Sequence, residues 1–435
     1  MVKKTFFVGL FIFVFSLNFV NAQSKGGAID DKPKGGAIDM SGEINGAPYR
    51  VVVPENWNGT LLLYAHGYRD RADHPGEVDN RNADVAPSAA LEPVLLAQGY
   101  ALAGSAYRNN GWAVEEGIQD MRNLALFFRF HVAQPDRTIM WAVSMGTVIG
   151  FKSAEDFGDI YDGFLCACAV GAGTARSFDT SADLMLAYDT VFGILPAWGT
   201  VGDVRDDLDF ETEVAPKIFA EVNNPANFPG YEFIRLVVGT PGRGITPPPP
   251  PAFYPGWVFT DVFFATEARA ELERRAGGPI VQNLNRNYSL TPQETGYLMA
   301  LGVPPAVINN WLAAMNGRRN ISAPHFSRFY VEQYASYTGN ILKPVLTMHT
   351  IIDPLVTVSQ ERAYADTVIA TNHDIRLFQT YTDGNGHCNF TGPQLLTAVN
   401  AINSWVITGV RPTQANFPAA VGFLPNFTPP PLNQP

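Results

Sequence analysis

Residues 137–150 of the chain read RTIMWAVSMGTVIG, and this stretch decides the fold. Thr138–Val143 is a short apolar run with β-branched ends, which predicts a buried strand. Met145–Ala154 predicts a helix whose first turn is small enough to pack close to a sheet. Ser144 therefore lies in a tight strand-to-helix turn, with a strained backbone and a hydroxyl that projects beyond the sheet edge. The positive end of the helix faces the same point, so the turn suits a nucleophile whose attack generates an anion. The alternative is an ordinary turn of an α/β protein without a chemical role.

Outward from this turn, apolar patterns typical of strands and helices alternate along the chain. The Asn45-Gly46 dipeptide predicts a hairpin near the start. The expected strands are Ala37–Ile44, Tyr49–Val53, Thr60–Tyr64, Tyr100–Ala106, Gly163–Val170, Val345–Thr350 and Ile375–Phe378. The expected helices are Pro87–Gln98, Val114–Val132, Ser359–Ile369 and Pro393–Val406. This order predicts an α/β fold, with a largely parallel sheet covered by helices on both faces, formed by residues 38–174 and 343–410.

A nucleophilic serine needs a general base, and the chain offers seven histidines. His387 lies in the loop expected for Tyr381–Phe390, within the glycine-rich sequence GNGHCN. Small neighbours let such a loop bring an imidazole close to a serine hydroxyl. His66 follows the strand Thr60–Tyr64 directly and is the other candidate. The sequence favours His387 as the base; the alternative is a loop histidine without a partner.

The base in turn needs an acid that fixes its tautomer and stabilises the imidazolium. Asp353 lies just past the end of an expected strand, where Pro354 forces a turn. Asp374 and Asp383 are nearer to His387 in the sequence, but such nearness means little in a fold closed by loops. We therefore expect Asp353 to be the acid; otherwise it is a turn or helix-capping residue.

The turn sequence AVSMG and its partners resemble the α/β-hydrolase superfamily, whose nucleophile elbow is usually written G-x-S-x-G. Ala142 replaces the first glycine of that motif, and alanine is still small enough for the turn. The chain order Ser144, Asp353, His387 is the order that this superfamily uses. The resemblance implies an α/β-hydrolase fold, with a mostly parallel central sheet, helices on both faces and an inserted, mainly helical cap.

The resemblance also implies an oxyanion hole, in which two N–H groups stabilise the charge of the reaction intermediate. The backbone N–H of Met145 is one expected donor. The backbone N–H of Tyr68, from the sequence His66-Gly67-Tyr68, is the other. By the same resemblance, His66 has a structural task.

Residues 175–342 interrupt the alternation, at the position where α/β-hydrolases carry a lid or cap. Three helices are expected here, Thr266–Ala276, Thr291–Leu301 and Pro304–Asn316, and the proline run Pro247–Pro251 predicts a stiff connector. We expect a mostly helical cap that covers Ser144 and shapes the substrate pocket. The alternative is a surface elaboration that does not affect the site.

The three cysteines allow at most one intramolecular disulfide. Cys166 and Cys168 lie two apart on an expected strand, and their spacing of about 6.6 Å is awkward for a bond between them. Cys168 could reach Cys388 beside His387, and buried free thiols are the alternative. The His-Cys pair is similar to that of tannase and feruloyl esterases, in which cysteines next to the serine and the histidine are bridged. Here Val143 precedes the serine, so that particular bridge cannot form.

Composition and the chain ends suggest where the protein acts. The 435 residues are 46% hydrophobic and 16% charged, and the net charge of −11 argues against a nucleic-acid partner. Residues 1–22 resemble a signal peptide, so we expect a secreted or periplasmic protein without a stable membrane anchor; an uncleaved anchor is the alternative. Residues 23–37 contain most of a duplicated hexapeptide, KGGAID, and predict a flexible leader. Residues 411–435 are a proline-rich tail, expected from Phe417 onward to lie on the surface or to be disordered.

These observations predict a serine hydrolase that cleaves carboxylic esters through an acyl-enzyme, without a metal or an organic cofactor. The expected partner is a small-molecule or polymeric ester. Aromatic residues of the cap suggest an apolar or aromatic substrate, unless they form the core of the cap: Tyr188, Phe192, Trp198, Phe253, Tyr254, Trp257, Phe263, Phe264 and Trp311. One alternative is a serine peptidase of the same fold, which would need charges that recognise an amine or a carboxylate. The other is a binding protein that has kept the fold without the chemistry.

Overall fold

The central sheet contains eight strands and is mostly parallel. In the computed structural model, which describes residues 36–71, 79–240 and 254–432, the strands are β1 (Ile38–Ile44), β2 (Ala47–Val53), β3 (Thr60–Ala65), β4 (Ala101–Ser105), β5 (Arg137–Val143), β6 (Gly163–Ala167), β7 (Val345–Ile352) and β8 (Leu377–Asn385). Their order across the sheet is β1-β2-β4-β3-β5-β6-β7-β8. The β1–β2 and β2–β4 pairs are antiparallel and all others are parallel. The carboxyl ends of β3, β5, β6, β7 and β8 therefore meet at one edge.

Helices cover both faces of the sheet, as expected. Successive residues of β3 point to opposite sides, so Leu61 and Leu63 pack in one core and Leu62 and Tyr64 in another. The helices beside the sheet are α1 (Glu92–Ala97), α2 (Val114–Phe127), α3 (Gly146–Asp156), α12 (Ser359–Ala370) and α13 (Gly392–Thr408). Residues of α2, α3 and α12 pack in the first core, and those of α1 and α13 in the second. Because helices cover both faces, the central strands β3 to β6 are buried on both sides and consist mainly of apolar residues.

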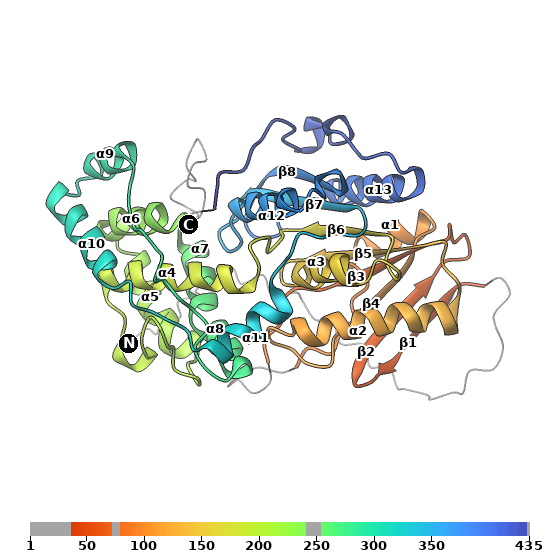
Figure 1. The fold of residues 1–435 in the computed structure, drawn as a ribbon, viewed down its shortest axis with the longest axis horizontal. Coiled ribbons are helices and arrows are strands. Elements are labelled where there is room, and N and C mark those ends of the chain that lie inside the picture. The colour runs from red at the N-terminus through yellow and green to blue at the C-terminus, as the bar shows by residue number, and fades with distance from the viewer. Residues whose placement is uncertain (1–35, 72–78, 241–253, 433–435) are drawn as a thin grey trace, which may run out of the picture. The chain divides into compact units, whose positions relative to one another are not determined.

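The chain between β6 and β7 is helical and has a core of its own. Figure 1 shows α4, α5, α6, α9 and α10 gathered to one side of the sheet. Buried side chains of α4 to α7, α9 and α10 form a separate hydrophobic cluster. The helices of this segment are α4 (Thr174–Phe192), α5 (Ala215–Val222), α6 (Phe228–Val238), α7 (Tyr254–Ala265), α8 (Glu267–Ala276), α9 (Pro292–Ala300), α10 (Pro305–Gly317) and α11 (His325–Ala335).

Several elements differ from the sequence prediction in extent. The helix expected over Pro87–Gln98 is only α1, because Pro93 occupies one of its first two positions, which proline favours. The helix expected to reach Val132 ends as a π-helical turn, Phe128–Val132. The last strand starts at Leu377 and continues to Asn385, so half of the loop predicted for Tyr381–Phe390 is strand. Its ladder with β7 continues past a bulge near Thr350.

The C-terminal segment packs against the sheet, whereas the sequence predicts a tail that lies on the surface or is disordered. Phe417 and Phe423 are buried, and the ring of Phe417 stacks on Phe378 of β8. The backbone N–H of Asp383 donates to Gly422, and Thr382 forms an antiparallel bridge with Phe423. A few hydrogen bonds and two aromatic anchors thus hold a proline-rich sequence in place.

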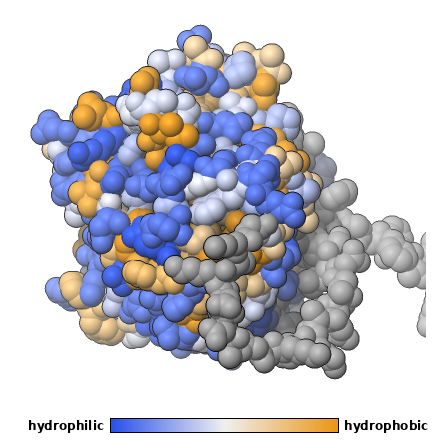
Figure 2. Space-filling view, turned by 90° about the vertical axis from the view of Figure 1, so that its right-hand side faces the viewer, coloured by the Kyte–Doolittle hydropathy of each residue, from blue (hydrophilic) through white to orange (hydrophobic). Residues whose placement is uncertain are grey.

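Some expectations fall outside the described residues. These are the signal peptide over 1–22, nearly all of the leader over 23–37, the connector Pro247–Pro251 and the last three residues of the tail. Among the described helices, none combines the length and the apolar composition that a bilayer span requires. On the face seen in Figure 2, the coloured apolar residues are scattered among polar ones and form no continuous patch.

Candidate active site

The turn after β5 holds Ser144 in a left-handed backbone conformation. Its φ is +52°, which a residue with a side chain adopts only when its surroundings impose it. The backbone N–H of Ser144 donates to the carbonyl oxygen of Ala167, 3.1 Å away, and so ties the turn to β6. α3 begins two residues later, so its N-terminus faces the serine. This is the strained turn that the sequence predicts.

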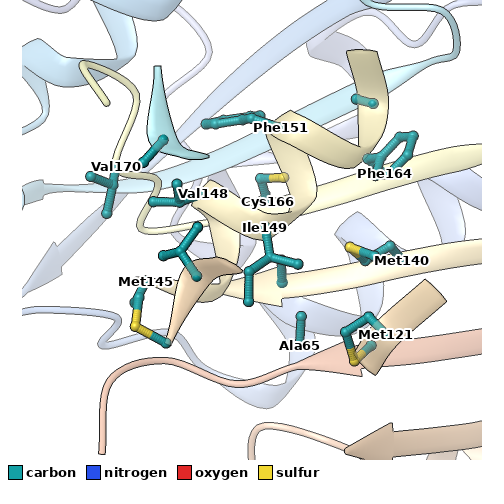
Figure 3. Packing of buried hydrophobic residues seen from close by; sticks show 14 of the residues in the cluster. Ala65, Met121, Met140, Met145, Val148, Ile149, Phe151, Phe164, Cys166 and Val170 are labelled. Carbon is teal, nitrogen blue, oxygen red and sulfur yellow. The ribbon is translucent and has the colours of Figure 1, made fainter. Parts of the chain in front are cut away.

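Gly146 makes the turn possible because α3 starts against the backbone of β3. A Cβ atom on Gly146 would lie 2.3 Å from the carbonyl oxygen of Ala65 and 2.7 Å from that of His66. Figure 3 shows Ile149 and Phe151 of α3 packed into the same apolar core as residues of the neighbouring strands. The helix can approach the sheet this closely only if its first residue has no side chain.

The substitution Gly146→Ala is therefore expected to destabilise the protein by about 2–3 kcal/mol, because a backbone oxygen cannot rotate out of the way. Gly296 in α9 is the matched control, since nothing lies within 4 Å of an added Cβ there. Gly296→Ala is expected to leave the protein as stable or to stabilise it by about 0.5–1 kcal/mol. Urea unfolding of both variants measures the difference. Equal midpoints would show that the α3 contact is not tight.

Three side chains distant in sequence form one hydrogen-bonded chain. Nε2 of His387 lies 2.7 Å from Oγ of Ser144, and Nδ1 of His387 lies 2.8 Å from Oδ2 of Asp353. Asp353 is buried, and its Oδ1 accepts the backbone N–H groups of Leu355 and Val356 at 3.0 and 2.9 Å. The carboxylate is therefore fixed by the turn that follows β7. The structure thus brings together the three residues singled out in the sequence.

A second buried histidine lies behind Asp353. Nε2 of His349, in β7, is 3.6 Å from Oδ2 of Asp353 and donates to the carbonyl oxygen of Val356 at 2.7 Å. Its Nδ1 lies 3.2 Å from Oε1 of Glu361 in α12. Burial alone would lower the pKa of His349, but the contact with Glu361 and the charge of Asp353 raise this pKa above its usual value. Sequence reasoning treated His349 only as a strand residue.

The loop after β3 passes directly beside the serine. A Cβ atom on Gly67 would lie 3.1 Å from Cβ of Ser144, which is a tight contact that the absence of a side chain avoids. Met145 follows Ser144 directly in the sequence, and Tyr68 follows Gly67, the residue that lies against Ser144. Within the described part of the chain, the backbone N–H groups of Tyr68 and Met145 donate no hydrogen bond. Both are free to act as donors to an anion.

His66 does not contact the serine hydroxyl. Its ring stacks on Tyr107 with centroids 4.0 Å apart, and its Nδ1 lies 2.6 Å from the carbonyl oxygen of Gly67. Burial lowers its pKa to about 3, so the imidazole is neutral. The hydroxyl of Tyr107 donates to the carbonyl oxygen of His66, which further fixes the loop. The residue supports the position of the loop, as the resemblance implies.

Cys168 and Cys388 form a disulfide with their Cα atoms 5.2 Å apart. Cys166 is a buried free thiol. Of the two possibilities left open by the sequence, the structure contains the bridge from the end of β6 to the loop that carries His387. The two sulfur atoms also approach the imidazole, but they are bonded to each other and are not available as thiolate ligands for a metal.

Ser144 opens into a pocket lined by both parts of the fold. Trp112, Val170 and Gln360 come from the sheet domain, whereas α4 and α7 supply the facing wall. The residues contributed by α4 and α7 are Ser177, Phe178, Thr180, Ser181, Leu184, Asp261 and Phe264. This wall combines three apolar side chains with three hydroxyl groups and one carboxyl group.

Most of the cap aromatics noted in the sequence do not reach this pocket. Phe264 lines it. Tyr188, Trp198 and Trp257 are buried in the cluster of the inserted helices, and Phe192, Phe263 and Trp311 pack against that cluster. Phe253 and the side chain of Tyr254 lie outside the described residues. The core of the inserted segment accounts for most of this aromatic content.

The strand order and the position of the serine after the fifth strand now identify the architecture. The chain has the α/β-hydrolase fold. The chain is similar to the o-phthalyl amidase of Xanthobacter agilis, with 22% identity over 407 residues that cover 85% of this chain and 87% of the amidase. No model of a known protein family matches this chain.

Solved structures of hydrolases also align with this chain. Feruloyl esterase B from Aspergillus oryzae is 14% identical with a TM-score of 0.41, covering 86% of this chain and 80% of the esterase. An epoxide hydrolase from Vigna radiata is 11% identical with a TM-score of 0.40, covering 85% and 98%. A carboxyl esterase from Bacillus coagulans is 11% identical with a TM-score of 0.39, covering 86% and 99%.

Proposed function

We propose that this α/β-hydrolase cleaves carboxylic esters, with Ser144, His387 and Asp353 as a catalytic triad. One observation carries the proposal, namely the hydrogen-bonded chain from the hydroxyl through the imidazole to the carboxylate, with distances of 2.7 and 2.8 Å. Nucleophile, base and orienting acid in this geometry are what acyl transfer requires.

In the proposed reaction, Oγ of Ser144 attacks the ester carbonyl while Nε2 of His387 accepts its proton. The backbone N–H groups of Met145 and Tyr68 stabilise the negative oxygen that forms. The imidazolium then gives its proton to the leaving alcohol, and an acyl-enzyme remains on Ser144. A water molecule, deprotonated by His387, attacks this acyl group. The bond between the acyl carbon and Oγ of Ser144 then breaks, His387 returns the proton to Oγ, and the acid is released. Asp353 keeps Nδ1–H in place and stabilises the imidazolium throughout.

A fluorophosphonate probe tests the nucleophile. The native protein is expected to be labelled at Ser144, and Ser144→Ala is expected to lose both the label and the hydrolysis of p-nitrophenyl esters. Mass spectrometry of the labelled peptide identifies the site. A native protein that remains unlabelled, while circular dichroism shows it to be folded, would contradict the proposal and favour a binding protein with this fold.

Amide hydrolysis is the second candidate, and it is supported by the similarity to o-phthalyl amidase over most of both chains. The same triad can cleave amides, because the imidazolium can protonate an amine leaving group. The rates of hydrolysis of an ester and an amide with identical acyl groups, measured in the same assay, distinguish the two candidate functions. An esterase is expected to hydrolyse the ester much faster, and an amidase to hydrolyse the amide at a comparable rate.

We also propose that the protein is exported to the periplasm or the cell exterior. Two observations support this location. Lys3 and Lys4 precede an apolar stretch of signal-peptide length, with small residues before Gln23. In addition, a disulfide such as Cys168–Cys388 persists in oxidising compartments.

A further inference from the structure

A buried carboxyl group of α7 lines the pocket and has no hydrogen-bond partner. Asp261 is only 5% exposed, and neither of its oxygens has a partner in the described part of the chain. It shares the pocket with Ser144. Thr240, on the same wall, likewise has an unpartnered hydroxyl.

A buried carboxyl group without a hydrogen-bond partner lowers the stability of the folded protein. Burial of a carboxylate without a partner costs several kcal/mol, on the order of the total stability of many domains, and is normally avoided. Burial, and to a smaller degree the charge of Asp353, raise the pKa of Asp261 well above its usual value. A leucine side chain, which has a similar size and no polar group, would avoid this cost. The position therefore makes sense if a ligand supplies the missing partner.

The rest of the pocket indicates which ligand would do so. Among the described lining residues, none is a lysine, an arginine or a histidine, so a substrate carboxylate would meet no counter-charge. The charge of the nearby Asp353 acts on Asp261, so this part of the pocket disfavours a further anion and favours a cation. Trp112, Phe178 and Phe264 add aromatic faces that attract cations.

We propose that Asp261 binds a cationic nitrogen of the substrate, so that the enzyme prefers esters or amides that carry an ammonium group. This inference rests on the proposed function, since it names the substrate class of the same site. The cation would stabilise the ionised form of the Asp261 carboxyl group through a charge-assisted contact, which is stronger than a contact between neutral groups. Asp261 is then a specificity-determining residue that touches the substrate outside the reacting bond.

Matched pairs of cationic and neutral esters test the proposal. On the acyl side, methyl 5-aminopentanoate is compared with methyl hexanoate, in which a methyl group replaces the ammonium group. On the alcohol side, butyrylcholine is compared with 3,3-dimethylbutyl butyrate. The native enzyme is expected to prefer the cationic member of at least one pair by tenfold or more in kcat/KM. Asp261→Asn, which keeps the size of the side chain and removes its charge, is expected to abolish this preference.

Two further measurements show whether a lost cation preference is caused by the missing charge of Asp261. Thr240→Val removes the neighbouring unpartnered hydroxyl without a change of charge, and it is expected to leave the cation preference unchanged. Asp261→Asn is also expected not to lower the melting temperature, because it replaces one unpaired buried polar group by another of the same size that carries no charge. This second readout shows that a lost preference does not result from unfolding.

The outcomes separate the two proposals. An enzyme that reacts with the fluorophosphonate probe but lacks a cation preference, or retains one in Asp261→Asn, overturns the role of Asp261 alone. Equal losses on both members of a pair in Asp261→Asn would mean that the carboxyl group acts as a neutral hydrogen-bond donor, which also overturns it. A protein that is neither labelled nor active on any ester overturns the proposed function itself.

Discussion

The substitution His387→Ala is expected to lower kcat for ester hydrolysis by about 10⁵-fold, with KM changed only a few-fold. His387 is the residue whose ring nitrogen contacts the hydroxyl of Ser144, at 2.7 Å. Without it, the proton of Ser144 has no acceptor during attack, and the leaving group has no donor. The substrate pocket does not include His387 among its lining residues, so binding is expected to persist. Steady-state kinetics on a p-nitrophenyl ester measures both constants.

His373 provides the matched control for this substitution. It precedes β8, at the end of the strand opposite to the His387 loop, and its Nδ1 lies 3.1 Å from the hydroxyl of Thr371. His373→Ala is expected to retain native kcat. A His387→Ala enzyme that keeps most of its rate would require another base and would remove the assignment of the triad.

Loss of the Cys168–Cys388 disulfide is expected to destabilise the protein by about 3–5 kcal/mol. The bond closes a loop of 220 residues, which restricts the unfolded chain by about 5 kcal/mol in the chain-entropy description. It also anchors the residue next to His387 to the end of β6. Activity is therefore expected to fall under reducing conditions before the protein unfolds.

Urea unfolding with and without reductant measures the effect. The native protein is expected to lose stability in reductant, because its disulfide is reduced. Cys166→Ala is expected to lose the same amount, because Cys166 is a free thiol and does not take part in the disulfide. The double variant Cys168→Ala/Cys388→Ala is expected to have the lower stability from the outset, and reductant is expected not to change it.

Exported protein, denatured without reductant, is expected to show one free thiol and to begin at Gln23. Three free thiols or an intact N-terminus would contradict the bridge or the export.

The hydrogen-bonded chain of Ser144, His387 and Asp353 was predictable because each of these residues lies where a local pattern changes. Ser144 ends an apolar run, Asp353 precedes a proline at a strand end, and His387 lies among glycines. These positions are all at carboxyl ends of strands, which a parallel sheet brings to one edge. The disulfide was left open, since the distance between β6 and the histidine loop depends on packing that no single segment encodes.

The inserted helices show where the sequence was insufficient. α4 was not predicted, although it is 19 residues long, because polar residues fall on its buried side. Asp179 of α4 forms a bidentate ion pair with Arg328 of α11 at 2.7 and 3.0 Å, and this partner is 149 residues away. Asp261 was missed for the same reason. A buried polar residue looks like a surface residue until its surroundings are known.

The segment after α13 protects an otherwise open border of the molecule. β8 is the last strand of the sheet, and its outer backbone groups would be unpaired without the chain around Phe423. The backbone N–H of Leu424 donates to Tyr381, and that of Asp383 to Gly422. An unpaired strand of this kind recruits strands from other copies. A chain shortened at residue 410 would therefore expose a template for self-association, and the proline content of the natural ending makes that ending a poor template itself.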